Sequence, residues 1–241
     1  MIDAIMQAER QPIRQLESKI EGFEKAKSSF NELDSLLQGF SDTLNDLDSR
    51  STFAAKTTSL SREDVPLSVS AGASAAPGSY DLEVTQLAQA HRVRSETMTD
   101  SNSPVVSDGT ITVQAGGYEE ISVDVSAASG NNSLRAIREA INEADQGVNA
   151  SIVNDGTGSI LVLRSEESGT AHGLTINDTT NLGLDAAENE LQAAQNAQAT
   201  VDGIAITSQT NEIRGAIAGV TLNLTGTTDS PVTLTVEEDT D

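Results

Sequence analysis

Histidine is the side chain best suited to proton transfer near neutral pH, and the chain has only two, His91 and His172. They lie far apart in the sequence, and no G-x-S-x-G pattern supplies the exposed serine of a Ser-His-Asp triad. Neither a phosphate-binding P-loop nor an H-E-x-x-H zinc helix occurs, and the absence of cysteine excludes thiol catalysis and zinc-thiolate sites. We therefore predict no catalytic residue and no cofactor, and we expect that the protein is not an enzyme.

Two loop-like stretches, NDGTGS at 154–159 and DTTN at 178–181, carry oxygen-bearing side chains of the kind that calcium prefers. Neither stretch has the ligand spacing or the final bidentate glutamate of an EF-hand. Asn, Asp and Gly are also the residues of ordinary tight turns. The turn is the simpler interpretation, and no metal site is predicted.

The chain is strongly acidic, with 37 acidic and 14 basic side chains and a formal net charge of −23. Such a charge repels phosphate backbones and anionic lipid, so neither nucleic acid nor a membrane is an expected partner. No run of ~18 apolar residues and no basic-then-apolar leader is present, which indicates neither a membrane span nor a Sec-type signal peptide.

Residue types are distributed unevenly along the chain. All four lysines and all four phenylalanines lie in residues 1–56, whereas 16 of the 18 glycines follow that range. This shift predicts a boundary near residues 50–60.

Before that boundary, residues 2–48 have no proline after Pro12, and their apolar side chains recur at helical spacing. The residues that stand seven apart, here called the apolar stripe, are Leu16, Phe23, Phe30, Leu37 and Leu44. A helix of ~35 residues is roughly 50 Å long and cannot bury such a stripe against itself. The stripe is therefore the predicted helix–helix interface, made either with another copy or with a partner helix. The alternative is an amphipathic helix that lies on the domain that follows it.

After residue 56 the hydrophobic period changes to two, as in strands. Residues 65–69 and 80–84, joined by AGASAAPG, predict an antiparallel pair. Residues 220–224 and 232–236, joined by GTTDSP, predict a second hairpin.

The middle of the chain has its own pattern. Strand-like segments at 107–113 and 121–125 flank a Gly116–Gly117 turn, and Asn132 or Ser133 can cap a short helix that Gly147 ends. VNASIV, the turn NDGTG and ILVL then predict another hairpin. The helical face consists of Leu134, Ile137, Ile141 and Ala144.

These segments predict an α+β fold, in which a long N-terminal helical arm is followed by two β-rich domains, the outer one inserted into the other. The predicted ranges are a helical segment at 1–54, a β-rich domain at 55–104 plus 179–241, and an inserted α+β domain at 105–178. Gly78, Gly156 and Gly203 are expected to set the turns. Cores without Phe or Trp depend on Val, Ile, Leu and Ala.

Several stretches in a fixed order carry a resemblance to a known family. TVDGIAITSQTNEIRGAIAGVTLNL at 200–224, preceded by AQNAQ, resembles the characteristic segment of the flagellar hook-associated protein 2 family, the filament cap. IMQAERQPIRQLESKI, PGSYDLEVTQLAQAHRV and GTITV agree with that family in order. The unit SLRAIREAINEADQGVNASIVNDGTGSILVLRS resembles the short motif shared with flagellins and hook-associated proteins.

The resemblance implies a structural cap of identical subunits at the distal end of the bacterial flagellar filament, beneath which exported flagellin folds and inserts. It implies as partners the protein itself, flagellin, the hook–filament junction proteins and a flagellar export chaperone. It also implies an extracellular location at the flagellum tip, reached through the flagellar type III channel. In the family, terminal helices form a leg and the β-rich domains form a plate.

Against the family's full pattern, we expect this chain to lack the extreme N-terminal residues and the C-terminal helices that would pair with the arm. Two other functions stay open. One is an extracellular adhesion module that binds a surface glycan or protein, although few aromatic residues are available for sugar stacking. The other is the hook–filament junction protein, which shares the repeat-like unit but not the 200–224 pattern.

Overall fold

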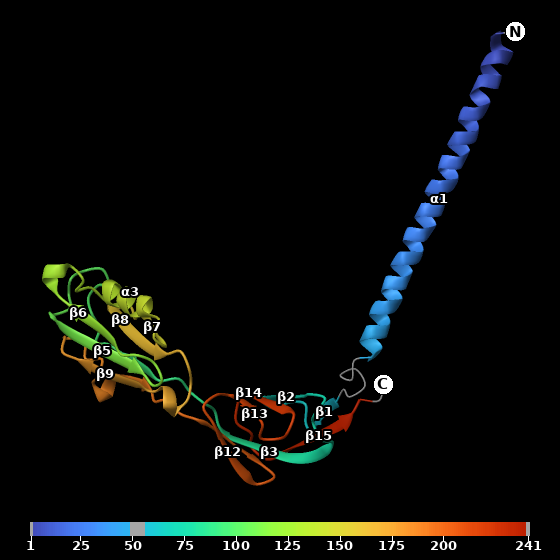
Figure 1. The fold of residues 1–241 in the computed structure, drawn as a ribbon. Helices are drawn as coiled ribbons and strands as arrows, with labels where there is room; N and C mark the ends of the chain where they lie inside the picture. Colours follow the sequence, from blue (N-terminus) through green and yellow to red (C-terminus); the bar gives the residue numbers. More distant parts are fainter. Residues whose placement is uncertain (1, 49–55, 240–241) are drawn as a thin grey trace. The chain divides into compact units, whose positions relative to one another are not determined.

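The structure, a computed structural model, describes residues 2–48 and 56–239, and within the first range it describes the side chains of residues 19–44. The chain forms two compact units, Met1–Ala55 and Lys56–Asp241. The first contains one long helix, and the second contains the strands and a further helix (Figure 1). The predicted α+β class, a helical arm followed by β-rich structure, is confirmed.

The helices of the described residues are α1 (Ile2–Asp48) and α3 (Leu134–Ala144), with short 3₁₀ turns η1 (Ala127–Ser129), η2 (Thr170–His172) and η3 (Ala187–Asn189). The strands are β1 (Lys56–Leu60), β2 (Leu67–Ala71), β3 (Gly78–Gln86), β4 (Arg92–Arg94), β5 (Gly109–Ala115), β6 (Ile121–Val125), β7 (Val148–Asn154), β8 (Ser159–Ser165), β9 (Leu174–Asp178), β10 (Glu190–Gln192), β11 (Ala197–Val201), β12 (Ile204–Ser208), β13 (Glu212–Arg214), β14 (Val220–Leu224) and β15 (Val232–Glu238).

Helix α1 occupies the range predicted from the 3.6-residue periodicity, and its 47 residues make it about 70 Å long. Ser35 and Thr43 each donate a side-chain hydrogen bond to the carbonyl four residues earlier, at Asn31 and Gly39. Among the described residues, no helix has both the length and the continuous apolar composition needed to cross a bilayer.

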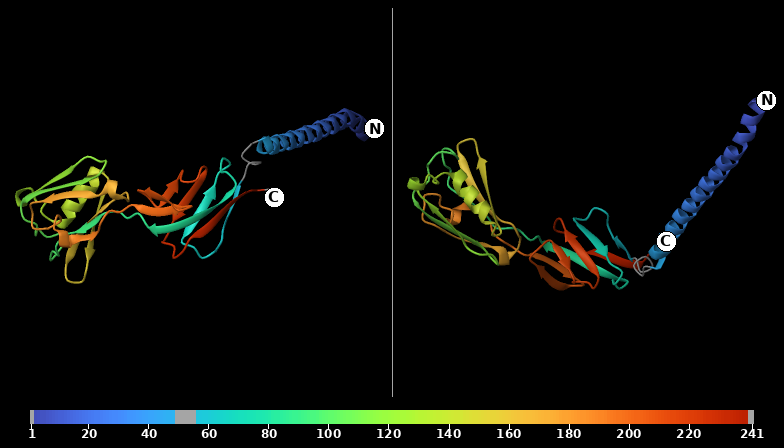
Figure 2. Two further views of the ribbon diagram at one scale, coloured as in Figure 1. Left: turned by 90° about the horizontal axis from the view of Figure 1, so that it is seen from below. Right: turned by 45° about the horizontal axis from the view of Figure 1, so that its top comes forward.

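Two groups of strands make up the second unit, and Figure 2 shows them as separate lobes. The split lobe is built from residues 56–86 and 197–238, which flank the other lobe in the sequence. Its sheets have the orders β1-β15-β3-β11-β12 and β13-β14-β2. Alternate residues of both sheets, such as Leu82 and Leu222, are buried in one shared core, so the sheets pack face to face.

The predicted strands of the split lobe exist, but both predicted pairings are wrong. Strand β2 pairs with β14, and β3 pairs with β15 and β11, all antiparallel. The connections after β2 and after β14 therefore carry the chain from one sheet to the other instead of closing a hairpin. Each connection is longer than a two-residue hairpin turn. The alternation of apolar and polar side chains therefore predicts where the strands are but not which strands pair.

The inserted lobe is formed by residues 92–192, which lie between β3 and β11 in the sequence. Its sheets have the orders β10-β4-β8-β7 and β6-β5-β9, and α3 packs against β6, β7 and β8. The predicted hairpins β5–β6 and β7–β8 are both confirmed. Ser133 is the N-cap of α3, since its hydroxyl accepts from Ala136 N.

The prediction that Gly147 ends helix α3 is wrong, because Gly147 lies two residues beyond the C-cap of the helix. The helix stops at Asp145, which adopts the left-handed conformation at φ 50°. Gly147 has a φ of 68°, and a Cβ on it would come within 2.6 Å of the Tyr118 ring. Glycine is therefore required here for both backbone conformation and space.

The two lobes have separate cores made of Val, Ile, Leu and Ala, with Met98 added in the inserted lobe. The core of the inserted lobe runs from Val93 to Leu184, so it includes residues on both sides of the predicted 105–178 range. The reason is that β4 and β10 join its larger sheet through β8. One tyrosine packs against each core, Tyr80 in the split lobe and Tyr118 in the inserted lobe.

Candidate assembly interface

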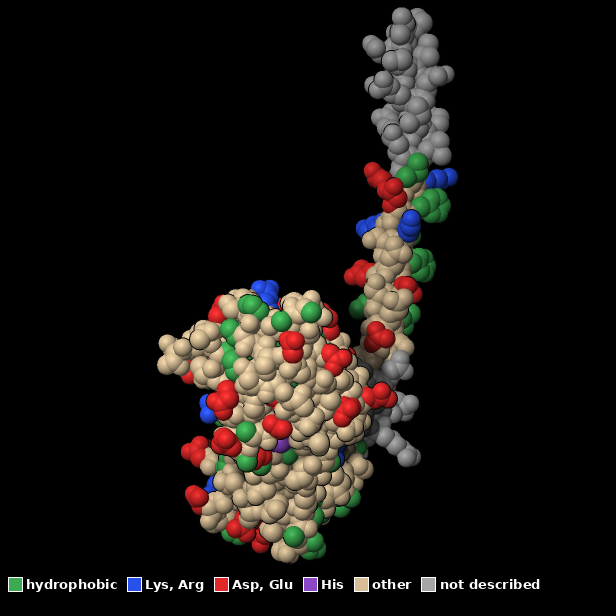
Figure 3. Space-filling view, turned by 90° about the vertical axis from the view of Figure 1, so that its left-hand side faces the viewer, with side chains coloured by type: hydrophobic (Ala, Val, Ile, Leu, Met, Phe, Trp, Pro, Cys, Tyr) green, Lys and Arg blue, Asp and Glu red, His purple; other side chains and the backbone are tan. Residues whose placement is uncertain are grey.

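The apolar stripe of α1 is exposed wherever its side chains are described. The exposed fractions are 74% for Phe23, 71% for Phe30, 57% for Leu37 and 48% for Leu44. Leu16, the fifth predicted contact residue, lies outside the residues whose side chains are described. Figure 3 shows apolar side chains projecting from the described part of the helix.

The second row of apolar side chains widens this exposed surface. Ile20, Leu33, Leu36 and Phe40 are each more than half exposed. Burying one Leu, Ile or Phe side chain contributes about 1.5–3 kcal/mol, and a helix supported only by its own hydrogen bonds is marginal in water. A partner that covers this surface would therefore stabilise both the contact and the helix.

A second set of contacts involves the 200–224 segment, whose sequence carries the family resemblance. The segment crosses both sheets of the split lobe, as β12, β13 and β14, and its 208–212 turn reaches toward the inserted lobe. Asn211 accepts from Ala88 N at 2.7 Å through Oδ1 and donates to Ala88 O at 3.0 Å through Nδ2. This pair of bonds anchors the chain just before it enters the inserted lobe.

Gln209, in the same turn, bonds directly to the inserted lobe. Its Oε1 accepts from Ala171 N at 3.0 Å, and its carbonyl accepts from Ser168 Oγ at 2.8 Å. Gly169 is buried at φ 94°, and a Cβ there would collide with Gln209 Oε1. On the strand side, Asn196 Oδ1 accepts from Thr170 N at 2.7 Å. The turn and its partners, here called the lobe joint, link the two cores through short polar side chains.

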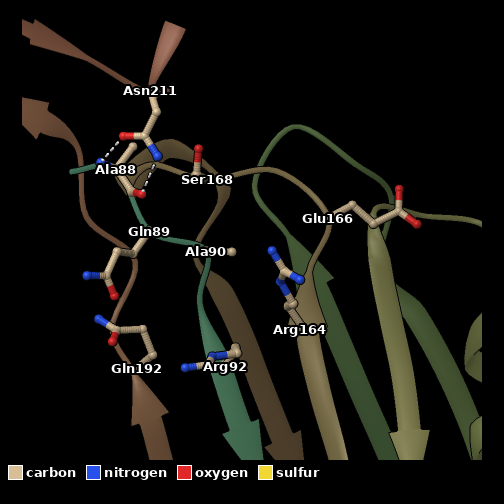
Figure 4. Close-up of a pocket in the computed structure, with 9 residues that line it drawn as sticks. All are labelled: Ala88, Gln89, Ala90, Arg92, Arg164, Glu166, Ser168, Gln192 and Asn211. Carbon is tan, nitrogen blue, oxygen red and sulfur yellow. Dashed lines mark hydrogen bonds between the residues drawn. The ribbon is translucent and has the colours of Figure 1, made fainter. Parts of the chain in front are cut away.

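Beside the lobe joint lies a hollow of about 420 Å³ (Figure 4). Residues of both lobes line it, including Asn211 of the joint and the pair Arg92 and Arg164. Figure 4 shows the two guanidinium groups pointing in different directions and the Glu166 carboxylate turned away from both. Hydrogen-bonding and charged side chains surround the hollow, so it suits a polar group.

The imidazoles of the two histidines link segments that are distant in the sequence. His91 Nδ1 accepts from Leu174 N at 2.8 Å, and its Nε2 lies 3.1 Å from Glu190 Oε1 without a well-aligned hydrogen bond. His172 lies between Gly116 O at 3.1 Å and Glu167 Oε2 at 3.0 Å. Within the described residues, no hydroxyl side chain is hydrogen-bonded to either imidazole. The pairing of base and nucleophile that acyl transfer needs is not formed there.

Glu167 also accepts from the Tyr118 hydroxyl at 3.1 Å. That hydrogen bond, with the negative charge of the same carboxylate, raises the pKa of Tyr118. The contact joins the β5–β6 turn to the end of β8 and has a structural role.

In the two loops considered for calcium, the aspartate carboxylates accept hydrogen bonds from backbone N–H groups. Asp155 Oδ1 accepts from Thr157 N and Gly158 N at 2.8 and 3.0 Å. The hydrogen bond from the Thr157 hydroxyl, followed by these two backbone bonds, lowers the pKa of Asp155. Asp178 accepts from Thr180 N and from Leu184 N. In the part of the chain that is described, no group of three or more His, Asp or Glu residues could hold a metal ion.

The three glycines expected to set turns behave differently. Gly156 and Gly203 have φ of 90° and 78°, and each lies in a tight turn between paired strands, as predicted. Gly78 has no positive φ, and it begins β3, where a Cβ would approach the Tyr80 ring. Its role is local packing against that ring.

Comparison with known families agrees with this architecture. Residues 1–91 match the model of the flagellar hook-associated protein 2 N-terminus, and residues 194–241 match the model of its C-terminus. Residues 110–167, within the inserted lobe, match the flagellin hook IN motif. The C-terminal match contains the lobe joint residues Asn196, Gln209 and Asn211.

Individual relatives give the same result. The flagellar hook-associated protein 2 of Escherichia coli K12 is 33% identical over 228 residues, which cover 88% of this chain and 48% of that protein. The crystal structure of the D1-D2-D3 domains of the E. coli flagellar cap protein FliD superimposes with a TM-score of 0.77 at 34% identity, covering 89% of this chain and 63% of the other. The D2-D3 structure from the same organism gives a TM-score of 0.65 at 34% identity, covering 77% and 100%.

The chain thus spans about half the length of the curated relatives it matches. These relatives are flagellar proteins, and they give no support to the adhesion-module alternative.

Proposed function

Because the chain belongs to the flagellar hook-associated protein 2 family, we propose that it acts as a structural cap at the distal end of the bacterial flagellar filament. As an oligomeric scaffold of identical subunits, it promotes the folding and insertion of exported flagellin. It works outside the cell and reaches the flagellum tip through the flagellar type III channel. The protein performs this role without catalysis, by shape and by subunit contacts.

The observation that carries the proposal is the exposed apolar stripe on α1. A helix with Phe and Leu side chains more than half exposed along several turns needs a helical partner in its working state. We infer that Leu16, Phe23, Phe30, Leu37 and Leu44 make the helix–helix contact. Residues 1–54 then serve as the leg segment, and the split lobe (56–86 and 197–238) and the inserted lobe (92–192), which replace the ranges 55–104 plus 179–241 and 105–178 expected from the sequence, form the plate.

Two further partners are part of the proposal. The hook–filament junction proteins would contact the cap before flagellin is added, and an export chaperone would cover the stripe before export. Both partners are those that the family resemblance implies, and the exposed apolar side chains of α1 are a surface that a partner could cover.

The test is genetic, in the bacterium that encodes the protein. Deletion of the gene should abolish filaments and release monomeric flagellin into the medium, and the wild-type gene should restore filaments. A complementing gene that carries F23E/F30E should fail, whereas one that carries K27E, which changes the net charge equally but lies off the stripe, should succeed. Normal filaments and motility in the deletion strain would reject the cap function.

A further inference from the structure

The arginines of the second unit fall into two classes. Arg135 and Arg138 pair with Glu139, Arg214 pairs with Glu212, and Arg62 donates to Ser230 O. The other three, Arg92, Arg94 and Arg164, make no ion pair or side-chain hydrogen bond with any described residue. In a chain with 37 acidic side chains, three unpaired arginines require an explanation.

All three lie on one face of one sheet. In the register of β4 and β8, Arg92 is directly opposite Arg164, and Arg94 is opposite Val162. Val93 and Leu163 point the other way, into the core, so the arginines share the face that the core does not cover. We call this the arginine face.

Among the described residues, no carboxylate pairs with these charges. Glu190 of β10 is opposite Val93 and contacts His91, and Glu166, which follows β8 and lines the hollow, forms no ion pair with either arginine. The remaining cross-strand neighbours of the arginines are Gln192, opposite Arg92, and Asn149, opposite Arg164, and both are neutral. Like charges directly opposite each other destabilise a strand pair. The sheet therefore keeps an unfavourable Arg92–Arg164 pair that the fold itself does not require.

The surroundings of the pair suit a polypeptide. Arg92 and Arg164 line the hollow of about 420 Å³ together with Gln89, whose half-buried side-chain amide has no hydrogen-bond partner among the described residues (Figure 4). Such an amide can both donate to and accept from a peptide backbone. Leu191 and Val153, at the two edge strands of the sheet, are each 50% exposed. Arginine is one of the residue types that are enriched at protein interfaces.

We propose that the arginine face binds an acidic polypeptide segment, whose carboxylates pair with Arg92 and Arg164 in the hollow. Guanidinium groups recognise carboxylates with two parallel hydrogen bonds, and a short acidic segment brings less opposing charge than an extended polyanion. The net charge of −23 disfavours nucleic acid and anionic membranes at longer range. This inference is independent of the proposed cap function, since it concerns a different surface.

The experiment uses the whole chain and a fluorescent eight-residue peptide of alternating Glu and Leu, with a Gln/Leu peptide as control. Fluorescence anisotropy at low salt should detect binding of the acidic peptide only, and the affinity should fall as salt rises. The variant R92Q/R164Q should bind at least about tenfold more weakly, because two charge-assisted contacts are lost. The matched control R135Q/R138Q removes the same charge from α3 and should bind like the wild type.

Four results would overturn the proposal. Equal binding by R92Q/R164Q and the wild type, or no binding by either, would remove the arginines from recognition. Equally tight, arginine-dependent binding of polyphosphate would make the face a general polyanion site. Self-association of the wild type without peptide, abolished in R92Q/R164Q by sedimentation, would make it a contact between copies.

Protein stability distinguishes binding from a structural role. Since the Arg92–Arg164 pair is repulsive, R92Q/R164Q should melt at or above the wild-type temperature. The single variant R164K keeps the charge but not the planar fork, and its affinity should lie between those of the wild type and the double variant. A lower melting temperature together with unchanged peptide affinity would show that the arginines support the fold instead.

Discussion

Apolar side chains have opposite surroundings in the two units of this protein. In residues 56–239, aliphatic side chains such as Leu161 and Leu234 are fully buried in two cores. In α1, the larger Phe23 and Phe30 are more than two-thirds exposed. The difference shows that the β-rich unit carries the partners of its own apolar side chains, whereas the described part of the helix has its largest ones open to contact.

The largest effect is expected at the apolar stripe, because it is the proposed interface. If the stripe joins copies of the chain, as proposed, the double substitution F23E/F30E should leave the chain monomeric. Each buried Phe contributes about 1.5–3 kcal/mol, so the association constant should fall by a factor of roughly 10² or more. Sedimentation velocity over a concentration series measures the change. K27E is the control, and equal loss of association in K27E would mean that charge, not the stripe, is responsible.

A cavity introduced into the inserted lobe tests whether the apolar side chains of the β-rich unit are packed in its own core. Leu161→Ala should reduce the free energy of unfolding of that lobe by about 2–5 kcal/mol, since Leu161 is fully buried. Val162→Ala, on the opposite face of β8, should have a much smaller effect. Urea unfolding followed by circular dichroism measures both. A similar loss for the two variants would contradict the packing described.

The lobe joint is tested by Asn211→Ala. Loss of both side-chain hydrogen bonds to Ala88 leaves two backbone groups without partners, and the cost should be about 1–3 kcal/mol. Hydrogen exchange at Ala88 N should accelerate in the variant. Gln198→Ala, an exposed side chain on β11, is the control and should leave stability unchanged. Unaltered exchange at Ala88 would show that Asn211 does not anchor the chain.

A smaller and opposite effect is expected in the helix. Gly39 has nothing within 4 Å of a built Cβ, so Gly39→Ala should increase helix stability by up to about 1 kcal/mol. Far-ultraviolet circular dichroism during thermal melting measures the gain. If helicity rises but association weakens, a partner helix must pack closely against position 39.

The smallest effect concerns pH. Hydrogen bonds from Thr157 and Gly158 lower the pKa of Asp155, so its contribution to stability is present above its ordinary pKa and is lost as the pH falls through the lowered value. Melting temperatures in acid should therefore decline slightly less steeply for Asp155→Asn than for the wild type. Identical acid dependence would exclude a role of this carboxylate in the β7–β8 turn.

Local patterns in the sequence were sufficient for the stripe, for helices α1 and α3, and for eight of the described strands, namely β2, β3, β5, β6, β7, β8, β14 and β15. The seven-residue spacing from Leu16 to Leu44 predicts α1, NDGTG with Gly156 predicts the β7–β8 hairpin, and Gly203 is predicted to lie in a turn, which the structure contains. Both patterns involve residues that are close in the sequence, and over such short distances the backbone geometry permits few alternative structures. The pairing of β2 with β14 could not be predicted in this way, because it joins segments about 150 residues apart and depends on which sheet each strand enters.

The polar sites were missed for the same physical reason. Asn211 and Gln209 look like ordinary turn residues until β11–β14 bring them beside Ala88 and Ala171. The arginine face is assembled from β4 and β8, which lie some 70 residues apart, and becomes visible only through their register. The surplus of acidic residues was a usable signal, since it makes any unpaired arginine unusual.

The cores built without Phe or Trp have a practical consequence for spectroscopy. Tyr80 in the split lobe and Tyr118 in the inserted lobe are the only tyrosines, and the chain has no tryptophan. Each lobe therefore carries a single intrinsic ultraviolet chromophore of its own. With Tyr80→Phe the remaining tyrosine emission comes from one lobe, and with Tyr118→Phe from the other, so the unfolding of each lobe can be followed without any attached dye.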